Sequence, residues 1–268
     1  MSGNEIDAFE REYIFCIWPG RDKLSPDRAT EVFSILANTH RPVVLLTPDT
    51  IRKWELPDYP FHPAVQYISE CHLSDYLRVY LMHHFGGGYS DIKFTFKPWD
   101  AAFQALKASD AYVLGYNFAS TSEFGLSKKY DGSALLEEYK EHYAPFGIGH
   151  VAFIFKRRTP LTTDMLNNLH ALLDEKLDQL KAHPSQAFKD FYGKILPDGT
   201  PSQYPLDYIE MGPDIFHQTL YRYREKIIHH DLQPLHTYHF NLEQPNYKQQ
   251  KRMFAEKFVP NWPFMPGE

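Results

Sequence analysis

The sequence has little cysteine, no excess of basic charge and no long apolar run. Its 268 residues include two cysteines, Cys16 and Cys71, so neither a disulfide framework nor a cysteine-rich metal site is expected. So few cysteines fit a reducing compartment. The formal net charge of −6 argues against general nucleic-acid binding, because that activity needs a basic surface.

Segments that would place the chain in or across a membrane are also missing. No stretch approaches the run of about 20 apolar residues that spans a bilayer. Residues 1–12 are polar and acidic, without the basic and apolar regions of a secretory signal. We therefore expect a cytoplasmic protein, and peripheral association with the inner face of a membrane stays open.

The residues that are present predict one large α/β domain. Hydrophobic residues make up 43% of the chain, enough for a substantial core. Apolar runs predict strands at 13–18 and 42–47, a short strand at 64–68, and a helix that Ser25 and Pro26 begin. Strands that alternate with helices indicate a mainly parallel, Rossmann-like sheet. We expect this domain to cover residues 1–232, with 233–268 as an irregular, aromatic-rich wrapping segment of the same domain.

One stretch, residues 73–93, combines several polar features. It predicts a helix, a turn made only of glycines, and a short strand. Asp75 and Arg78 are three residues apart and share a face of the helix. Asp91 follows the glycines, so two carboxylates and a guanidinium are expected to converge. Each piece alone is more typical of a capped helix with a surface ion pair, but their ordered combination is more specific.

This stretch resembles the donor site of glycosyltransferase family 32 and of related sugar-transferring enzymes, which include the glucosylating clostridial toxins. The family pattern runs Ser-Asp-x-x-Arg, an apolar helix, Gly-Gly-x-Tyr and then Asp-x-Asp. The matching positions here are Ser74, Asp75, Arg78, Gly87, Gly88, Tyr89, Asp91 and Lys93. One of them departs from the pattern, because Lys93 stands where the family has its second acid.

The resemblance implies a GT-A glycosyltransferase that moves a hexose from a nucleotide sugar to a glycan or glycolipid, with retention of anomeric configuration. It also implies a role in the synthesis of surface polysaccharide or lipopolysaccharide. Asp91 and Lys93 are the implied catalytic residues. The implied donor-binding residues in this stretch are Asp75, Arg78, Gly87, Gly88, Tyr89 and Asp91.

The departure at Lys93 bears on a metal cofactor. In the family this position helps to hold a divalent ion, Mn²⁺ or Mg²⁺, at the diphosphate. A lysine would repel such an ion by several kcal/mol at a separation of about 4 Å and an effective dielectric constant of about 20. Three hypotheses follow: Lys93 replaces part of the metal's function, Lys93 points away, or Asp91 and a C-terminal residue still bind the metal.

Three further positions complete the expected donor site. Trp18 ends the first predicted strand, where the family stacks a tryptophan on the nucleotide base; a Trp that caps the core is the alternative. His150 stands where the family often has a polar residue near the sugar, although a lone histidine beside a strand is more often structural. Gly212 and Pro213 resemble the family's Gly-Pro turn before a late helix.

Two other functions remain open from the sequence. The chain could resemble an effector or toxin that glycosylates a protein. Alternatively, it could be a non-catalytic module that binds sugar nucleotides and whose Asp-x-Lys motif has lost activity.

Overall fold

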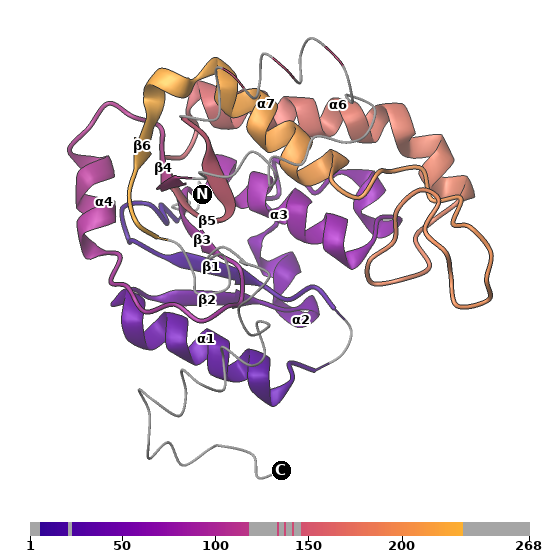
Figure 1. The fold of residues 1–268 in the computed structure, drawn as a ribbon, viewed down its shortest axis with the longest axis horizontal. Coiled ribbons are helices and arrows are strands. Elements are labelled where there is room, and N and C mark those ends of the chain that lie inside the picture. The colour runs from indigo at the N-terminus through magenta and orange to yellow at the C-terminus, as the bar shows by residue number, and fades with distance from the viewer. Residues whose placement is uncertain are drawn as a thin grey trace.

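The computed structural model describes residues 6–20, 23–117, 133, 137, 141 and 146–232, and within them a six-stranded sheet lies among helices (Figure 1). The strands are β1 (Ile14–Ile17), β2 (Val43–Leu46), β3 (Gly87–Ser90), β4 (Val113–Asn117), β5 (Ile148–Phe155) and β6 (Ile227–His229). The α-helices are α1 (Pro26–Thr39), α2 (Pro48–Ile51), α3 (Glu70–His84), α4 (Asp100–Lys107), α6 (Pro160–Ala182) and α7 (Ile215–Arg222).

The sheet has the strand order β2-β1-β3-β5-β4-β6. β1 runs parallel to β2 and to β3, and β4 runs parallel to β6. β5 is antiparallel to both of its neighbours, β3 and β4. The predicted α/β class with a mainly parallel sheet is confirmed, and the antiparallel β5 is the exception that the strand–helix alternation did not reveal.

Helices cover both faces of the sheet, as the alternation of side chains along β3 shows. Gly88 faces Trp99, the residue that precedes α4, because a Cβ added there would lie 2.8 Å from the indole ring. Tyr89 points to the opposite face and stacks on Phe153, with ring centroids 5.2 Å apart. Phe153 in turn packs against Phe216 of α7. α7 contacts α6, and α6 contacts α3, so these three helices form one layer (Figure 1).

Hydroxyl side chains begin the main helices. Ser25 caps α1 as predicted, Ser69 caps α3 and Thr159 caps α6, each accepting a hydrogen bond from a backbone N–H of the first turn. Ser69 is the cap of α3, so the helix begins at Glu70. The apolar spacing predicted a start at Leu73, three residues later. Apolar residues at helical spacing over residues 160–182 predict a core-facing helix. α6 confirms this prediction, because Leu169 and Leu173 are completely buried.

The strand predicted at 64–68 is wrong. Residues Pro63–Gln66 form a 3₁₀ helix instead. Pro63 occupies its first position, and Nδ1 of His62 accepts a hydrogen bond from the backbone N–H of Ala64 at 3.1 Å. These local constraints start a helical turn and outweigh the strand preference of the following apolar residues.

The glycine turn forms as predicted at Gly86 and Gly87, whose φ angles are +67° and +93°. However, Gly87 and Gly88 already belong to β3. A Cβ at Gly87 would lie 2.8 Å from the carbonyl oxygen of Tyr13, so only glycine lets this strand approach its neighbours so closely.

Other predictions fall on residues outside the described ranges. They are the loop at 117–132 beyond Asn117, most of the short helix predicted at 133–142, and the C-terminal segment 233–268.

Gly88→Ala is expected to lower the free energy of unfolding by roughly 2 kcal/mol, because the added methyl group overlaps Trp99 and Ile14. Urea unfolding at neutral pH measures the change. Ala101→Ser, an exposed position on neighbouring α4, is the control and should stay within about 0.5 kcal/mol of the unaltered protein. A Gly88→Ala variant of unaltered stability would contradict this packing.

Candidate functional site

The two carboxylates and the arginine predicted to converge do so in the structure. Asp75 and Arg78 lie on α3, with Arg78 Nη1 3.3 Å from Asp75 Oδ1. Asp91 comes directly after β3, and Arg78 Nη2 lies 3.2 Å from its Oδ1. The guanidinium thus bridges two acids that are 16 positions apart in the chain.

Lys93 points toward Asp91 rather than away from it. Its Nζ lies 2.8 Å from Asp91 Oδ2. The hydroxyl of Tyr89 donates a hydrogen bond of 2.6 Å to Asp91 Oδ1, the same oxygen that Arg78 contacts. Arg78 also lies over the Tyr89 ring, 4.6 Å from its centroid. Both oxygens of Asp91 therefore have partners within the chain. We call Asp75, Arg78, Tyr89, Asp91 and Lys93 the charged cluster.

The two acids of the charged cluster have opposite electrostatic environments. Burial alone raises the pKa of a carboxyl group, and it raises the pKa of Asp75 although Arg78 opposes the effect. At Asp91 the attraction of Lys93 and Arg78 outweighs burial and holds the pKa far below its usual range. Asp91 is consequently a firmly fixed anion, whereas the environment of Asp75 disfavours its charge.

Gly212 lies directly against the carboxylate of Asp75. It belongs to η6 (Glu210–Asp214), a π-helical turn that continues into α7, so the Gly-Pro turn predicted here is helical. A Cβ at Gly212 would lie 2.9 Å from Asp75 Cγ. This contact covers Asp75, whose side chain is 9% exposed, whereas those of Asp91 and Lys93 are 20% and 13% exposed. Asp91 and Arg78, at 20% and 16%, are accordingly the most exposed charged side chains of the cluster, and Asp75 is the least exposed.

Gly87 and Gly88 contact the core rather than the charged cluster. The nearest atoms to a Cβ at these positions belong to the backbone of Tyr13 and to Trp99. Their observed role is to let β3 pack closely, which positions Asp91 at the end of the strand.

Trp18 lies at the same edge of the sheet as Asp91. Phe15 pairs with Tyr89 in parallel register, and continuing that register sets Ile17 level with Asp91. Trp18 follows Ile17, the last residue of β1. It is therefore at the carboxyl end of a parallel strand, where ligands of such sheets gather.

A second aromatic ring, which sequence reasoning missed, accompanies Trp18. Phe188 lies with its ring centroid 6.4 Å from that of Trp18, at an angle of 39°, and is 50% exposed. Its carbonyl oxygen accepts a hydrogen bond from the N–H of Cys71 in the first turn of α3. Phe188 is 170 positions from Trp18 in an irregular segment, so no local pattern could have indicated the contact.

His150 takes part through its backbone. It lies inside β5, which begins at Ile148, rather than before the strand as predicted. Its carbonyl oxygen is 3.4 Å from Arg78 Nη1. Burial, with a smaller contribution from Arg78, lowers the pKa of the imidazole to about 3, so the ring is neutral at physiological pH. It is near the ring of His217, whose pKa burial also lowers to about 3.

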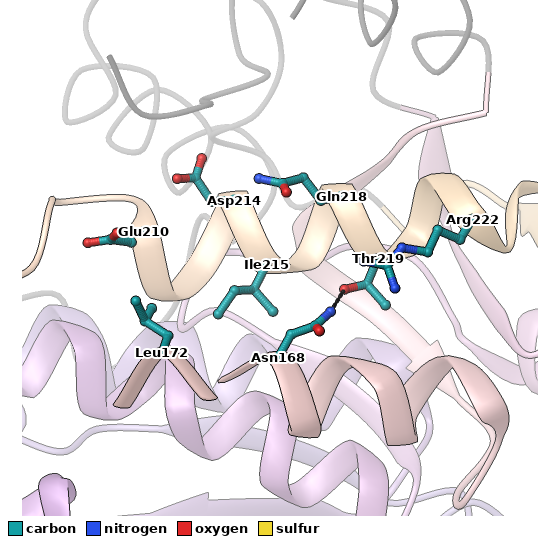
Figure 2. A pocket seen from close by; sticks show the side chains of 8 residues that line it. All are labelled: Asn168, Leu172, Glu210, Asp214, Ile215, Gln218, Thr219 and Arg222. Atoms are coloured by element: carbon teal, nitrogen blue, oxygen red, sulfur yellow. Dashed lines mark hydrogen bonds between the residues drawn. The ribbon is translucent and has the colours of Figure 1, made fainter. Parts of the chain in front are cut away.

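A pocket of about 190 Å³ lies beside η6, α7 and α6. Figure 2 shows Asn168 and Leu172 rising toward it from α6, and Asn168 donating a hydrogen bond to Thr219. Its lining residues are Asn168, Leu172, Glu210, Asp214, Ile215, Gln218, Thr219 and Arg222. Glu210 and Asp214 flank Gly212, but neither Asp91 nor Lys93 lines this pocket.

In the part of the chain that the structure describes, no group of three His, Cys, Asp or Glu side chains could hold a metal ion. Within the same residues, no helix has the length and apolar character needed to cross a membrane.

Comparisons with known proteins give only distant structural similarity. No protein-family model matches the sequence, and no curated protein matches it. A solved structure named PaToxG Glycosyltransferase is similar with a TM-score of 0.40 and 12% sequence identity, over 79% of this chain and 68% of that chain. A similarity of this size does not identify a family.

Asp91→Asn is expected to reduce the free energy of unfolding at pH 7 by about 2–3 kcal/mol, because Lys93 and Arg78 lose their counter-ion while the site stays partly exposed. A depressed folded-state pKa stabilises the protein above the unfolded pKa of about 3.9, and this contribution is lost as the pH falls. The difference between the two proteins should therefore narrow by about 1 kcal/mol at pH 3.

Urea unfolding at both pH values measures this difference. Asp178→Asn is the control, because the Asp178 side chain is 97% exposed and its removal should produce no comparable pH-dependent difference. An Asp91→Asn effect that is equal at pH 7 and pH 3 would show that Asp91 is not a stabilised anion.

Proposed function

We propose that this chain is a glycosyltransferase that moves a sugar from a nucleotide sugar to an acceptor hydroxyl. The observation that carries the proposal is that Asp91 and Lys93 meet the Asp75–Arg78 pair at the sheet edge that also bears Trp18. An aromatic face, fixed cations and a carboxylate at one edge are what a base, a diphosphate and a sugar require.

Each accessible residue has a distinct role in this proposal. Trp18, with Phe188 beside it, offers a face on which the nucleotide base stacks. Asp91 has about four acceptor positions, of which Arg78, Tyr89 and Lys93 take three, so it can accept one further hydrogen bond from a sugar hydroxyl. Asp75 is covered by Gly212, and its role is to orient Arg78 rather than to bind sugar.

The reaction breaks the bond between the anomeric carbon and the diphosphate oxygen, and the electron pair leaves with the nucleoside diphosphate. The acceptor oxygen forms the new bond to the anomeric carbon, and its proton passes to the departing diphosphate. Negative charge grows on the leaving oxygen in the transition state. Preorganised cations nearby stabilise that charge without having to reorganise, which is the contribution we assign to Lys93 and Arg78.

The finer parts of the proposal rest on the sequence resemblance alone. They are a hexose as the transferred group, retention of configuration, and a glycan or glycolipid acceptor in the synthesis of surface polysaccharide or lipopolysaccharide. We further propose, from the sequence composition, that the chain acts in the cytoplasm; peripheral association with the inner face of a membrane stays open. A protein acceptor is the alternative, and mass spectrometry of glycan and protein candidates after incubation with donor distinguishes the two.

A non-catalytic module that binds sugar nucleotides is the second candidate. It is favoured by one observation: Lys93, Arg78 and Tyr89 already occupy most of the hydrogen-bond acceptor positions of the Asp91 carboxylate. The charged cluster therefore holds together without a ligand. Slow release of nucleoside diphosphate from a nucleotide sugar without acceptor indicates an enzyme. Binding without such release indicates the module.

A panel of nucleotide sugars is expected to contain at least one that raises the melting temperature, because a ligand that binds only the native state stabilises it. With that donor, Trp18→Ala should weaken binding about 10-fold through the loss of stacking, and Trp18→Phe should retain most of the affinity. Isothermal titration calorimetry measures both. Unchanged affinity of the Trp18→Ala variant for the donor would show that Trp18 is not part of the donor site.

Asp91→Asn is expected to lower the rate of transfer or of donor hydrolysis by about 100-fold or more, because the sugar and Lys93 both lose their anionic partner. The rate is measured as release of nucleoside diphosphate, on protein shown by circular dichroism to be folded. Asp178→Asn again serves as the control. Normal turnover by folded Asp91→Asn would contradict the assignment of the site.

A further inference from the structure

We infer that the ammonium group of Lys93 is the resident cation of this site, and that the chain binds the diphosphate of its donor without a divalent metal ion. This inference rests on the proposed function. Its starting point is the distance of 2.8 Å between Lys93 Nζ and Asp91 Oδ2, on a lysine whose side chain is 13% exposed.

The donor set does not fit a divalent ion. A metal ligand needs a carboxylate oxygen with a free lone pair directed at the ion. Arg78 and Tyr89 occupy Oδ1 of Asp91, and Lys93 occupies one acceptor position of Oδ2. The one position that remains on Oδ2 lies beside the Lys93 ammonium group, which admits a neutral sugar hydroxyl but repels a divalent ion. The second carboxylate, Asp75, is held by Arg78 on one side and covered by Gly212 on the other, so it cannot turn toward a metal at Asp91.

Charge balance leads to the same conclusion. Asp75 and Asp91 bring at most two negative charges, and Arg78 and Lys93 bring two positive charges. The cluster therefore has no net negative charge, and a divalent ion added to it would face two cations without a net anionic site. A diphosphate, by contrast, is an anion that approaches a lysine and an arginine.

Lys93 is suited to this role because Asp91 positions it. An ammonium group has three hydrogen-bond donors, and the contact with Asp91 uses one of them. Two donors remain for the oxygens of a phosphate. Asp91 thus orients the ammonium group of Lys93, which contacts the diphosphate leaving group. Arg78 holds Asp91 in place through its other carboxylate oxygen.

Binding of UDP, GDP and the other nucleoside diphosphates to the full chain tests the inference, by calorimetry in excess EDTA and in millimolar Mn²⁺. We expect the nucleoside diphosphate that binds to do so equally well in both buffers. Lys93→Met should weaken its binding by about 10-fold or more, and Lys93→Arg should retain much of it.

Lys97→Met is the matched control, because Lys97 is an ion-paired lysine in the same segment whose partner is Asp231 rather than Asp91. It should bind like the unaltered protein. Lys93→Asp supplies a gain-of-function test, since it frees Asp91 and adds a second carboxylate. This variant should bind the diphosphate only with Mn²⁺ and should bind Mn²⁺ itself, detected as the loss of the free-ion electron paramagnetic resonance signal.

The outcomes separate this inference from the proposed function. If the unaltered protein binds a nucleoside diphosphate only when Mn²⁺ is present, the metal is held by other residues, the inference is overturned, and the proposed function stands. If no nucleoside diphosphate binds in either buffer, the proposed function and this inference both fail. Equal binding by Lys93→Met and the unaltered protein also overturns the inference.

Discussion

The Asp91 carboxylate is the junction on which the site depends. Its backbone N–H donates to the carbonyl oxygen of Val151 in β5, at 2.8 Å, and its side chain joins Arg78 of α3 to Lys93. An anion in this setting is stable only if its charge and lone pairs are matched. Three segments, α3, β5 and the end of β3, therefore meet at this single residue, through its backbone and its side chain.

The two acids around Arg78 divide the work of the site. Asp75 is the inner acid, closed off by Gly212 and in surroundings that favour its neutral form. Asp91 is the outer acid and stays ionised under any physiological condition. Opposed environments for neighbouring carboxyl groups are a common way to give them different roles. In the proposed function, Asp75 orients Arg78, and Asp91 and Lys93 contact the donor.

Local signals allowed part of this to be predicted. Strand β1, helix α6 and the cap at Ser25 follow from apolar spacing and capping chemistry, and the spacing of Asp75, Arg78 and Asp91 predicted their convergence. Long-range features could not be predicted. The antiparallel direction of β5 depends on which strands lie beside it in the sheet, and no local sequence signal indicates these neighbours. The contact of Phe188 with Trp18 joins two segments whose sequences carry no sign of the pairing. At 64–68 a proline turn outweighed strand propensity.

Strand β6 has a consequence for how the chain is made. It pairs in parallel with β4, and Val113 is the partner of Ile227. Ile227 is synthesised more than one hundred residues after Val113, so this pairing cannot form before then. Until then one side of β4 offers unpaired backbone groups, and such an edge invites association with other chains. Contacts over this separation also slow folding. Completion of the sheet is thus a late step in biosynthesis, and this edge of β4 stays exposed until then.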